Sequence, residues 1–203
     1  MGSDTRIHAV TWMGVALGIL GWLAGGCASQ EPPRLPEASG SPGAQAVLIP
    51  EVPFFPQEDY YCGPASLASV LRYYGAALDQ HTIAEQIYLP RLRGTLTLDM
   101  LAYPASIGFK AHSYRGSLDD LKRRVLAAQP LILFLDRGSW LLPRYHYLVA
   151  IGFDGRDQSV IAHSGALART RIPYRDLLAA WRKTDYWTLR IEPPSKFQHK
   201  DVQ

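Results

Sequence analysis

The sequence has little cysteine, no long run of lysine and arginine, and no closely spaced pair of cysteines or histidines. Its net charge is +3 at pH 7, and the basic residues are not gathered in one stretch. Nucleic acid is therefore not expected as a partner. Cys62, His146 and His163 lie far apart in the sequence, whereas the ligands of a zinc motif come in close pairs. We expect neither a metal nor another cofactor.

The N-terminus has the pattern of a targeting segment. Arg6 precedes an apolar stretch over residues 9–24, and small residues lead into Cys27 in LAGGC. This pattern resembles a bacterial lipoprotein signal, which predicts a signal peptide over residues 1–26 and a lipid on Cys27. Ala28, at the next position, implies the outer membrane facing the periplasm by the same resemblance. An uncleaved anchor helix is the alternative, but polar and proline-rich sequence follows at once.

A lipid on Cys27 leaves Cys62 as the only free thiol, without a partner for an intramolecular disulfide. A single thiol in an oxidising periplasm is at risk of oxidation, so its presence indicates a chemical role. Proline, glycine, serine and glutamate then predict a flexible tether over residues 27–46. The folded domain is expected to span residues 47–192, and a disordered polar tail residues 193–203.

The stretch FFPQEDYYCGPASLASVLRYYG, residues 54–75, predicts a helix that begins near Cys62. Pro64 suits the first turn, apolar residues recur at helical spacing, and Gly75 ends the helix. Unpaired N–H groups at a helix start favour an anion, so we expect a stabilised thiolate that acts as a nucleophile. Gln57 lies five residues upstream, where an oxyanion-hole glutamine would be. The alternative is a buried structural cysteine.

Helical patterns dominate the first half of the folded part, and strand patterns dominate the second half. Further helices are predicted over residues 82–87, 98–107 and 117–128. Thr97 is expected as an N-cap, Pro104 to cause a kink or early end, and Ser117 with Asp120 to form a variant of the capping box. Strands are predicted over residues 109–114, 130–135, 145–153, 160–163, 170–172 and 186–191. This order predicts an α+β domain of two layers, in which a helical layer carries the cysteine and an antiparallel sheet carries the histidine.

His146 lies at the start of the apolar strand YHYLVAIGFD and shares its strand face with Leu148 and Ala150. We expect this imidazole to take the proton of Cys62 and later to protonate the leaving amine. Two alternatives stay open. His146 is a structural histidine bonded to a carbonyl group, or it joins Cys62 and His163 in a zinc site.

Together, QEDYYCGPASLASVLRYYG and HYLVAIGFD resemble the papain-like double-glycine peptidases, which process leader peptides of bacteriocins, and their lipoprotein relatives in proteobacteria. The resemblance runs over about residues 52–191. It implies a papain-like fold with Cys62 as nucleophile, His146 as base and Gln57 as oxyanion donor. Ser164 and the glycine after it depart from the aspartate and proline that are usual in the family. A serine fixes the imidazole tautomer but provides no full negative charge for the imidazolium.

These observations predict a lipid-anchored cysteine peptidase that cleaves peptide bonds through a thioester acyl-enzyme, with Ser164 orienting His146. The expected partners are a peptide or protein substrate and the membrane. Ser164 also motivates an alternative, a non-catalytic peptide-binding lipoprotein. A thiol amidase or acyltransferase on the same fold is a second alternative.

The loop DRGSWLLPRY precedes His146 and carries Trp140, Leu141 and Leu142, whose side chains have the setting of exposed residues. Large apolar side chains in a loop line a substrate cleft or pack into the core. The sequence does not distinguish these two possibilities.

Overall fold

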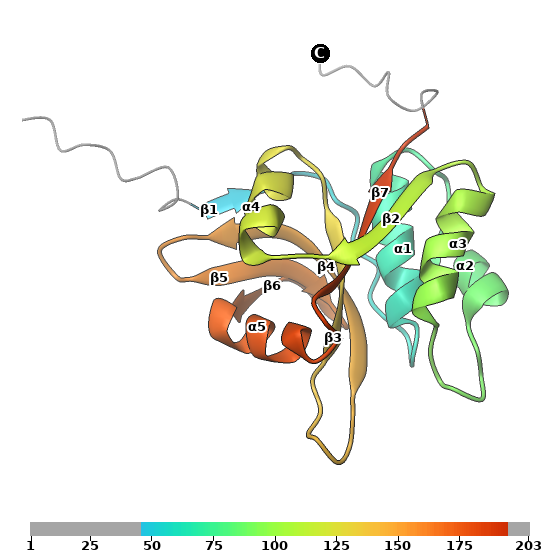
Figure 1. The fold of residues 1–203 in the computed structure, drawn as a ribbon. Helices are drawn as coiled ribbons and strands as arrows, with labels where there is room; N and C mark the ends of the chain where they lie inside the picture. The colour runs from blue at the N-terminus through green and yellow to red at the C-terminus, as the bar shows by residue number, and fades with distance from the viewer. Residues whose placement is uncertain (1–45, 195–203) are drawn as a thin grey trace, which may run out of the picture. The chain divides into compact units, whose positions relative to one another are not determined.

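A seven-stranded antiparallel sheet forms the centre of the part of the chain that the structure, a computed structural model, describes, residues 46–194 (Figure 1). The strand order is β2-β7-β3-β4-β5-β6, and β1 pairs with the end of β4. The strands are β1 (Ala46–Leu48), β2 (Lys110–Arg115), β3 (Leu131–Asp136), β4 (Tyr145–Asp154), β5 (Ser159–Ser164), β6 (Leu167–Pro173) and β7 (Trp187–Glu192).

Strand β4 organises the sheet because it pairs with three other strands. Its first part pairs with β3, from Asp136 opposite Tyr145 to Leu131 opposite Ala150. Its last part pairs with β1, and its other edge pairs with β5. Leu135 of β3 is paired opposite His146, and the pairing with β5 begins at Val149 opposite His163, so β5 ends near the start of β4.

Between residues 46 and 194, five helices cover the sheet. They are α1 (Cys62–Tyr73), α2 (Gln80–Ile87), α3 (Thr97–Ser106), α4 (Leu118–Leu126) and α5 (Tyr174–Arg182). Figure 1 shows α1, α2 and α3 on one side of the sheet and α4 and α5 on the other. The predicted arrangement, a helical layer with the cysteine against an antiparallel sheet with the histidine, is confirmed, and α4 and α5 add helices on the second side.

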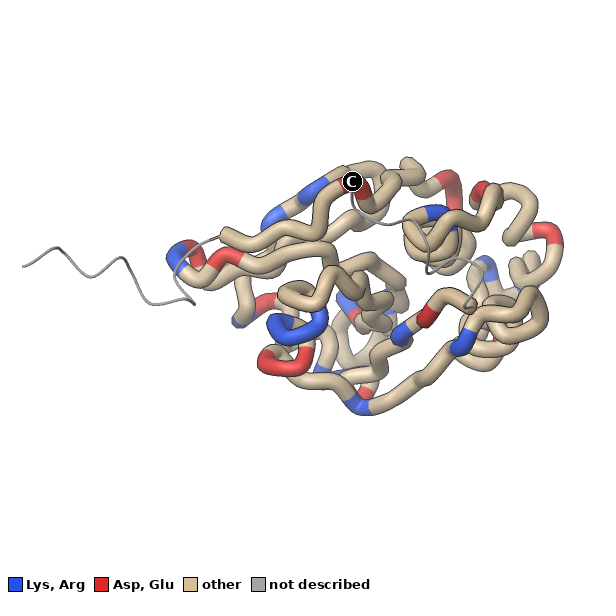
Figure 2. The backbone as a smooth tube through the Cα atoms, turned by 90° about the horizontal axis from the view of Figure 1, so that it is seen from above, with Lys and Arg blue, Asp and Glu red and all other residues tan. Residues whose placement is uncertain are grey.

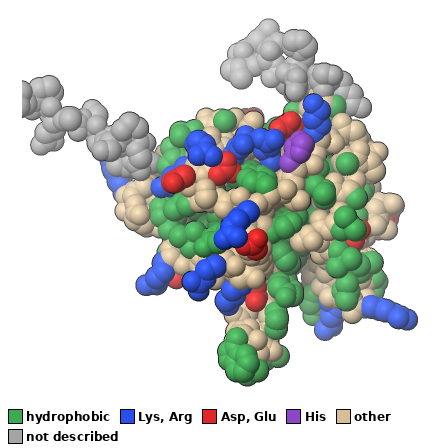
Figure 3. Space-filling model, viewed as in Figure 1, with side chains coloured by type: hydrophobic (Ala, Val, Ile, Leu, Met, Phe, Trp, Pro, Cys, Tyr) green, Lys and Arg blue, Asp and Glu red, His purple; other side chains and the backbone are tan. Residues whose placement is uncertain are grey.

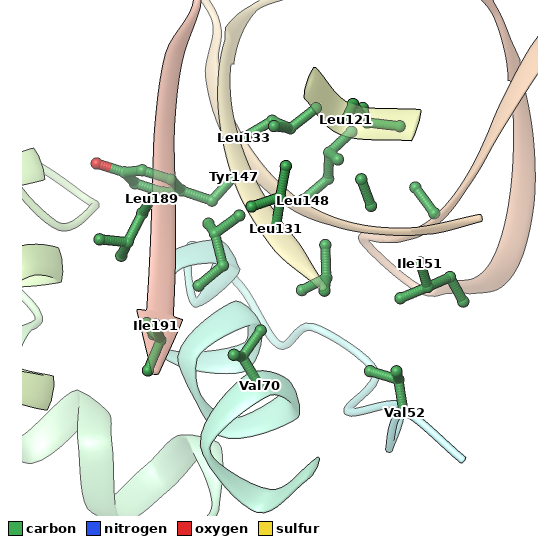
Figure 4. Close-up of a cluster of buried hydrophobic side chains, with 14 of the residues drawn as sticks. Val52, Val70, Leu121, Leu131, Leu133, Tyr147, Leu148, Ile151, Leu189 and Ile191 are labelled. Carbon is green, nitrogen blue, oxygen red and sulfur yellow. The ribbon is translucent and has the colours of Figure 1, made fainter. Parts of the chain in front are cut away.

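Helix α1 is the central helix of the core. Every residue from Gly63 to Leu71 is buried, because the helix packs against the sheet as well as against α2 and α3. Leu67 and Val70 are fully buried, and Figure 4 shows Val70 pointing into the apolar cluster between α1 and the strands. Burying one such side chain stabilises the fold by about 1.5–3 kcal/mol. Packing therefore holds the start of α1, and with it Cys62, in place.

The start of α4 agrees with the prediction from the sequence, whereas the start of α3 differs from it. Ser117 caps α4 by accepting a hydrogen bond from the N–H of Asp120, as predicted. Thr97 is not an N-cap, because α3 already includes it and begins after Leu96. Pro104 lies inside α3, which ends at Ser106, so the helix stops soon after the proline.

Helix α5 lies in a stretch for which we predicted no element. Tyr174, Leu177 and Trp181 form its buried stripe at helical spacing. The stripe covers the side of the sheet opposite α1. The helix begins at Tyr174, directly after Pro173, the last residue of β6.

Charge and hydropathy give no sign of an extended charged face or of a membrane span in this part of the chain. Lys and Arg positions alternate with Asp and Glu positions along the tube in Figure 2. None of the helices between residues 46 and 194 has the length and apolar character needed to cross a bilayer. The predicted signal peptide, the lipidated Cys27, most of the tether and the tail from residue 195 lie outside the described residues.

Candidate active site

Cys62 is the first residue of α1 and a free thiol. Burial raises the pKa of the thiol above its ordinary value, and hydrogen bonds from the backbone of Tyr147, Gly63 and Cys62 itself offset part of this effect. The expectation that the helix start alone yields a thiolate near neutral pH is therefore wrong for the free protein, because desolvation outweighs the backbone N–H groups. Cys62 needs a base.

A small cavity beside the thiol brings three of the predicted site residues together. Gln57, Cys62 and Ser164 all line it, along with Tyr147 and His163. Two hydrogen bonds hold the strand-like segment that carries Gln57. The N–H of Gln57 donates to the carbonyl of Gly165 at 3.0 Å, and the side-chain amide of Gln80 donates to the carbonyl of Pro56 at 2.9 Å.

Ser164 connects this cavity to His146. Its Oγ lies 2.9 Å from Nε2 of His146. Burial and, to a smaller extent, the positive charge of Arg137 lower the pKa of His146 to about 4. The imidazole is therefore neutral at pH 7. Between residues 46 and 194 no hydrogen bond involves Nδ1 of His146, so one ring nitrogen stays free.

Within residues 46–194 no hydrogen bond joins the thiol of Cys62 to the imidazole of His146. The sulfur contacts the backbone of Tyr147, the residue that follows His146. His146 does not line the cavity beside Cys62, whereas Tyr147 and Val149, the alternate residues of β4, do. Catalytic hydrogen bonds are often long in a free enzyme and tighten when substrate binds.

His163 has a structural setting and not a ligating one. Its Nε2 lies 3.0 Å from the carbonyl of Val52, and its Nδ1 accepts a hydrogen bond from the N–H of Arg169. Both ring nitrogens are thus engaged, and burial, the main cause, lowers the pKa of His163. In residues 46–194 no three His, Cys, Asp or Glu side chains are grouped to hold a metal ion. The zinc alternative has no support from this geometry.

A second, larger cleft leads to Cys62 from the outside. Its volume is about 700 Å³, and it lies between the α2–α3 connection and the sheet. Aromatic side chains form much of its wall, since Phe134 stacks on Tyr145 at 5.3 Å and on Tyr147 at 4.5 Å. The residues around it are Cys62, Leu92, Arg93, Gly94, Thr95, Leu96, Thr97, Phe134, Tyr145, Tyr147, Lys183, Thr184 and Trp187. The volume and aromatic wall of this cleft suit the binding of a peptide segment.

Gly63 and Thr95 are site residues that the sequence analysis missed. A Cβ at Gly63 would lie 2.9 Å from Cβ of Thr95 and 3.0 Å from the sulfur of Met100. The glycine after Cys62 therefore allows α1 to approach the α2–α3 connection. The Oγ1 of Thr95 is buried without a hydrogen-bond partner and belongs to the wall of the cleft. Only tertiary contacts reveal these roles.

Comparisons with known proteins agree with this arrangement. A C39-like peptidase described from Bacillus anthracis is 18% identical, with a TM-score of 0.60 over 75% of this chain and 100% of that one. The peptidase domain of Streptococcus ComA, a bifunctional ABC transporter of a quorum-sensing pathway, is 22% identical, with a TM-score of 0.55 over 70% and 99%. A double glycine motif protease from an AMS/PCAT transporter, solved with its leader peptide, is 24% identical, with a TM-score of 0.56 over 71% and 93%.

At these identities the solved structures establish only the fold. The family is established by a match to a sequence-based model of a protein family. Residues 49–188 match the model described as the Peptidase_C39 like family. A search of curated proteins found no match. The chain belongs to the Peptidase_C39 like family, and it is a cysteine peptidase with the papain-like arrangement of that family.

Proposed function

We propose that this peptidase cleaves peptide bonds through a thioester on Cys62, with His146 as the proton carrier. One observation carries the proposal. Gln57, Cys62 and Ser164 line the same cavity, and Ser164 is hydrogen-bonded to His146. A nucleophile, an amide donor and an oriented base are the three parts that acyl transfer needs.

In the first half of the reaction, the sulfur of Cys62 attacks the carbonyl carbon of the peptide bond. The thiol proton moves to Nδ1 of His146, while Nε2–H donates to Oγ of Ser164. The side-chain amide of Gln57 and the N–H of Cys62 hold the oxyanion. The C–N bond then breaks, and the imidazolium gives its proton to the leaving amine.

In the second half, water attacks the thioester. His146 takes a proton from the water, the oxyanion forms again in the same place, and the C–S bond breaks. The sulfur recovers the proton from the imidazolium, and the carboxylic product leaves. Both halves use the same base and the same donors.

The resting pair is neutral, because burial raises the pKa of Cys62 and lowers that of His146. A preformed thiolate and imidazolium are therefore disfavoured before substrate binds. Proton transfer accompanies the attack, and His146 acts as a general base. The hydroxyl of Ser164 orients the ring, without the charge that would stabilise an imidazolium.

The substrate we propose is a peptide with glycines at the cleaved bond. The cavity beside Cys62 is small and is bordered by Tyr147 and Val149, so residues without side chains reach the sulfur most easily. The wider aromatic cleft accepts apolar side chains farther along the peptide. The AMS/PCAT protease, solved with a leader peptide and named for a double glycine motif, supports this substrate class.

The test uses reporter peptides that contain Gly-Gly or, as a control, Val-Val before the fluorophore. We expect cleavage of the Gly-Gly peptide by the parent chain, none by Cys62→Ala, and a kcat about 100-fold to 1,000-fold lower for Gln57→Ala. Mass spectrometry of rapidly quenched samples should detect the acyl group on Cys62. An intact peptide with no acyl-enzyme would indicate the peptide-binding alternative, and transfer to an added amine in place of water would indicate an acyltransferase.

We also propose that Cys27 carries a lipid that attaches the enzyme to the outer membrane on its periplasmic side. The LAGGC sequence supports this part. Labelling of growing bacteria with an alkyne-bearing fatty acid should mark the parent chain and leave Cys27→Ala unmarked, while Cys62→Ala serves as the matched control. Separation of inner and outer membranes then locates the labelled protein.

A further inference from the structure

Two connections on the same side of the molecule carry exposed apolar side chains. Figure 1 shows the α2–α3 and β3–β4 connections extending in the same direction, and Figure 3 shows a hydrophobic tip where the β3–β4 hairpin ends. In that hairpin Trp140 is 89% exposed, Leu141 65% and Leu142 73%. Leu92, in the α2–α3 connection, is 61% exposed. The three hairpin residues are exposed, as the sequence suggested, so the core-packing alternative is wrong, and they are not among the residues around the cleft.

Hydrogen bonds hold the backbone of the β3–β4 hairpin tip in a defined turn. The N–H of Arg137 donates to the carbonyl of Arg144 at 2.9 Å, and the N–H of Ser139 donates to the carbonyl of Leu142 at 3.1 Å. The carboxylate of Asp136 accepts hydrogen bonds from the N–H groups of Gly138 and Arg144, both at 2.9 Å. These bonds close a tight turn with Trp140 and Leu141 at its end. Turns usually carry glycine, asparagine or aspartate at such positions.

The backbone atoms inside the hairpin leave no room for a side chain at Gly138. A Cβ at Gly138 would lie 2.0 Å from the carbonyl oxygen of Leu142 and 2.6 Å from the nitrogen of Arg144. The ammonium group of Lys183 donates to the carbonyl of Gly138 at 2.5 Å and holds the hairpin base against the end of α5. The apolar tip is thus held out from the surface at low entropic cost for binding.

The charges around the two tips have one sign. Residues 88–96 and 137–145 contain Arg91, Arg93, Arg137 and Arg144 and no aspartate or glutamate. All four arginines are exposed. Arg137 and Arg144 lie at the base of the hairpin, and Arg91 and Arg93 flank Leu92 in the turn closed by Leu89 and Gly94. Apolar side chains beside arginines match a lipid surface, where acyl chains lie beneath anionic headgroups.

We propose that these two connections, the hairpin 137–145 and the loop 88–96, dock on an anionic phospholipid bilayer. The tips are convex, whereas peptides and small ligands bind in concave sites. The arginines would repel the same face of a second copy of this chain. Trp140 enters the interface between headgroups and acyl chains, the leucines lie deeper, and the arginines contact phosphate. The cleft to Cys62 lies between the two connections, so docking turns its opening toward the lipid surface.

This inference rests on the surface alone and not on the proposed catalytic roles. It predicts a second membrane contact, independent of any lipid on Cys27. Its test therefore needs a readout that is local to the hairpin, because an attached lipid would hold every variant on vesicles.

The vesicle experiments use the chain from residue 27 onward, because the predicted signal peptide contains Trp12 and Trp22. The vesicles are of phosphatidylcholine and phosphatidylglycerol and contain brominated acyl chains, which quench tryptophan emission on contact. We expect quenching in the parent that disappears in Trp140→Phe, and that stays in Trp187→Phe. Vesicles of phosphatidylcholine alone should quench less. Absence of any quenching that depends on Trp140, in chains that sediment with the vesicles, would overturn the proposal.

Two further variants separate apolar from ionic contributions. W140S/L141S/L142S should weaken vesicle binding by roughly 100-fold in chains that carry Cys27→Ala. Leu126→Ser with Leu167→Ser, which alters exposed leucines elsewhere, should leave binding unchanged. Arg93→Gln combined with Arg144→Gln should weaken vesicle binding by about fivefold for each arginine. Arg156→Gln, in the β4–β5 turn, should weaken vesicle binding much less. Equal losses for the hairpin variant and its control would contradict the proposal.

The same triple variant distinguishes the other possible occupants. If it left vesicle binding intact but raised KM for the reporter peptide in vesicle-free solution, the hairpin would be a substrate contact and the proposal would fail. If it abolished a concentration-dependent dimer seen by sedimentation in the absence of vesicles, a second copy would be the occupant. Unchanged near-ultraviolet circular dichroism would confirm that the variant is folded, as expected for exposed side chains.

Discussion

His146 and His163 lie on neighbouring strands, yet their surroundings differ in the one respect that matters for proton transfer. His163 is held at both nitrogens by backbone groups, the carbonyl of Val52 and the N–H of Arg169. His146 is held at Nε2 by the hydroxyl of Ser164. An imidazole with both nitrogens engaged is a structural part, whereas one with a free nitrogen can accept a proton. Burial lowers the pKa of both, so pKa alone does not separate them.

The largest expected effect comes from replacing each histidine in turn. His146→Ala should lower kcat/KM for the Gly-Gly reporter peptide by about 100-fold to 10,000-fold, because general-base catalysis is lost. His163→Ala should lower kcat/KM by less than tenfold, but it should reduce the free energy of unfolding by about 2–4 kcal/mol, since two buried backbone groups lose their partner. Steady-state kinetics and urea unfolding measure the two quantities. Equal loss of activity in two fully folded variants would erase the distinction.

The second-largest effect is expected from giving His146 a charged hydrogen-bond partner, which would increase the difference between the two histidines. Ser164→Asp places a carboxylate beside Nε2, which raises the pKa of His146 from about 4 and stabilises a thiolate on Cys62. An opposite charge at this distance shifts a pKa by about 1–3 units, so the alkylation rate of Cys62 by iodoacetamide at pH 6 should rise at least about tenfold. Ser164→Asn is the neutral control of similar size. A rate that rises equally in both variants would exclude the charge as the cause.

The pH dependence of stability should show the cost of the buried neutral imidazole. The folded state keeps His146 unprotonated down to pH about 4, whereas the unfolded chain binds a proton near 6.5. The unfolded state therefore gains protons first, and stability is lost as the pH falls from 6.5 to about 4. Up to about 3 kcal/mol comes from this residue. Urea unfolding at pH 6.5 and at pH 4 measures this loss. The free energy of unfolding of His146→Gln should fall by about 3 kcal/mol less than that of the parent between the two pH values. An equal fall in both chains would contradict the burial of a neutral His146.

The smallest expected effect concerns Arg137, whose charge also lowers the pKa of His146. Arg137→Gln should raise that pKa and speed alkylation of Cys62 at pH 6 by less than about threefold, because the guanidinium is exposed and screened. Arg144→Gln is the matched control, since Arg144 is equally exposed in the same hairpin. An effect of the control as large as that of Arg137→Gln would point to the hairpin backbone and not to charge.

Local patterns were sufficient where an element depends on neighbours in sequence. The spacing of apolar residues after Cys62 predicted α1, and Ser117 with Asp120 predicted the start of α4, because caps and helical stripes involve residues three or four positions apart. The long apolar run before Asp154 predicted β4 in the same way. Helix α5 had its own signal in Tyr174, Leu177 and Trp181, which the sequence analysis passed over.

The errors concern properties that depend on burial. The helix start suggested an acidic thiol, but the surroundings of Cys62 raise its pKa, because desolvation by distant parts of the chain exceeds the effect of nearby N–H groups. Core packing of Trp140, Leu141 and Leu142 was as plausible from the sequence as exposure, and the structure shows that they are exposed. Composition does not tell whether an apolar side chain in a loop points inward or outward.

The sequence by itself determined the family, the helix that carries Cys62 and the strand that carries His146, since motifs and periodicity are properties of neighbouring residues. Only the tertiary structure decided which groups meet. It placed Gln57 and Ser164 around one cavity with the thiol, connected Ser164 to His146, engaged both nitrogens of His163 and kept the hairpin tip outside the core. Hydrogen-bond partners and desolvation arise from segments far apart in the chain, and these set the protonation states on which catalysis depends.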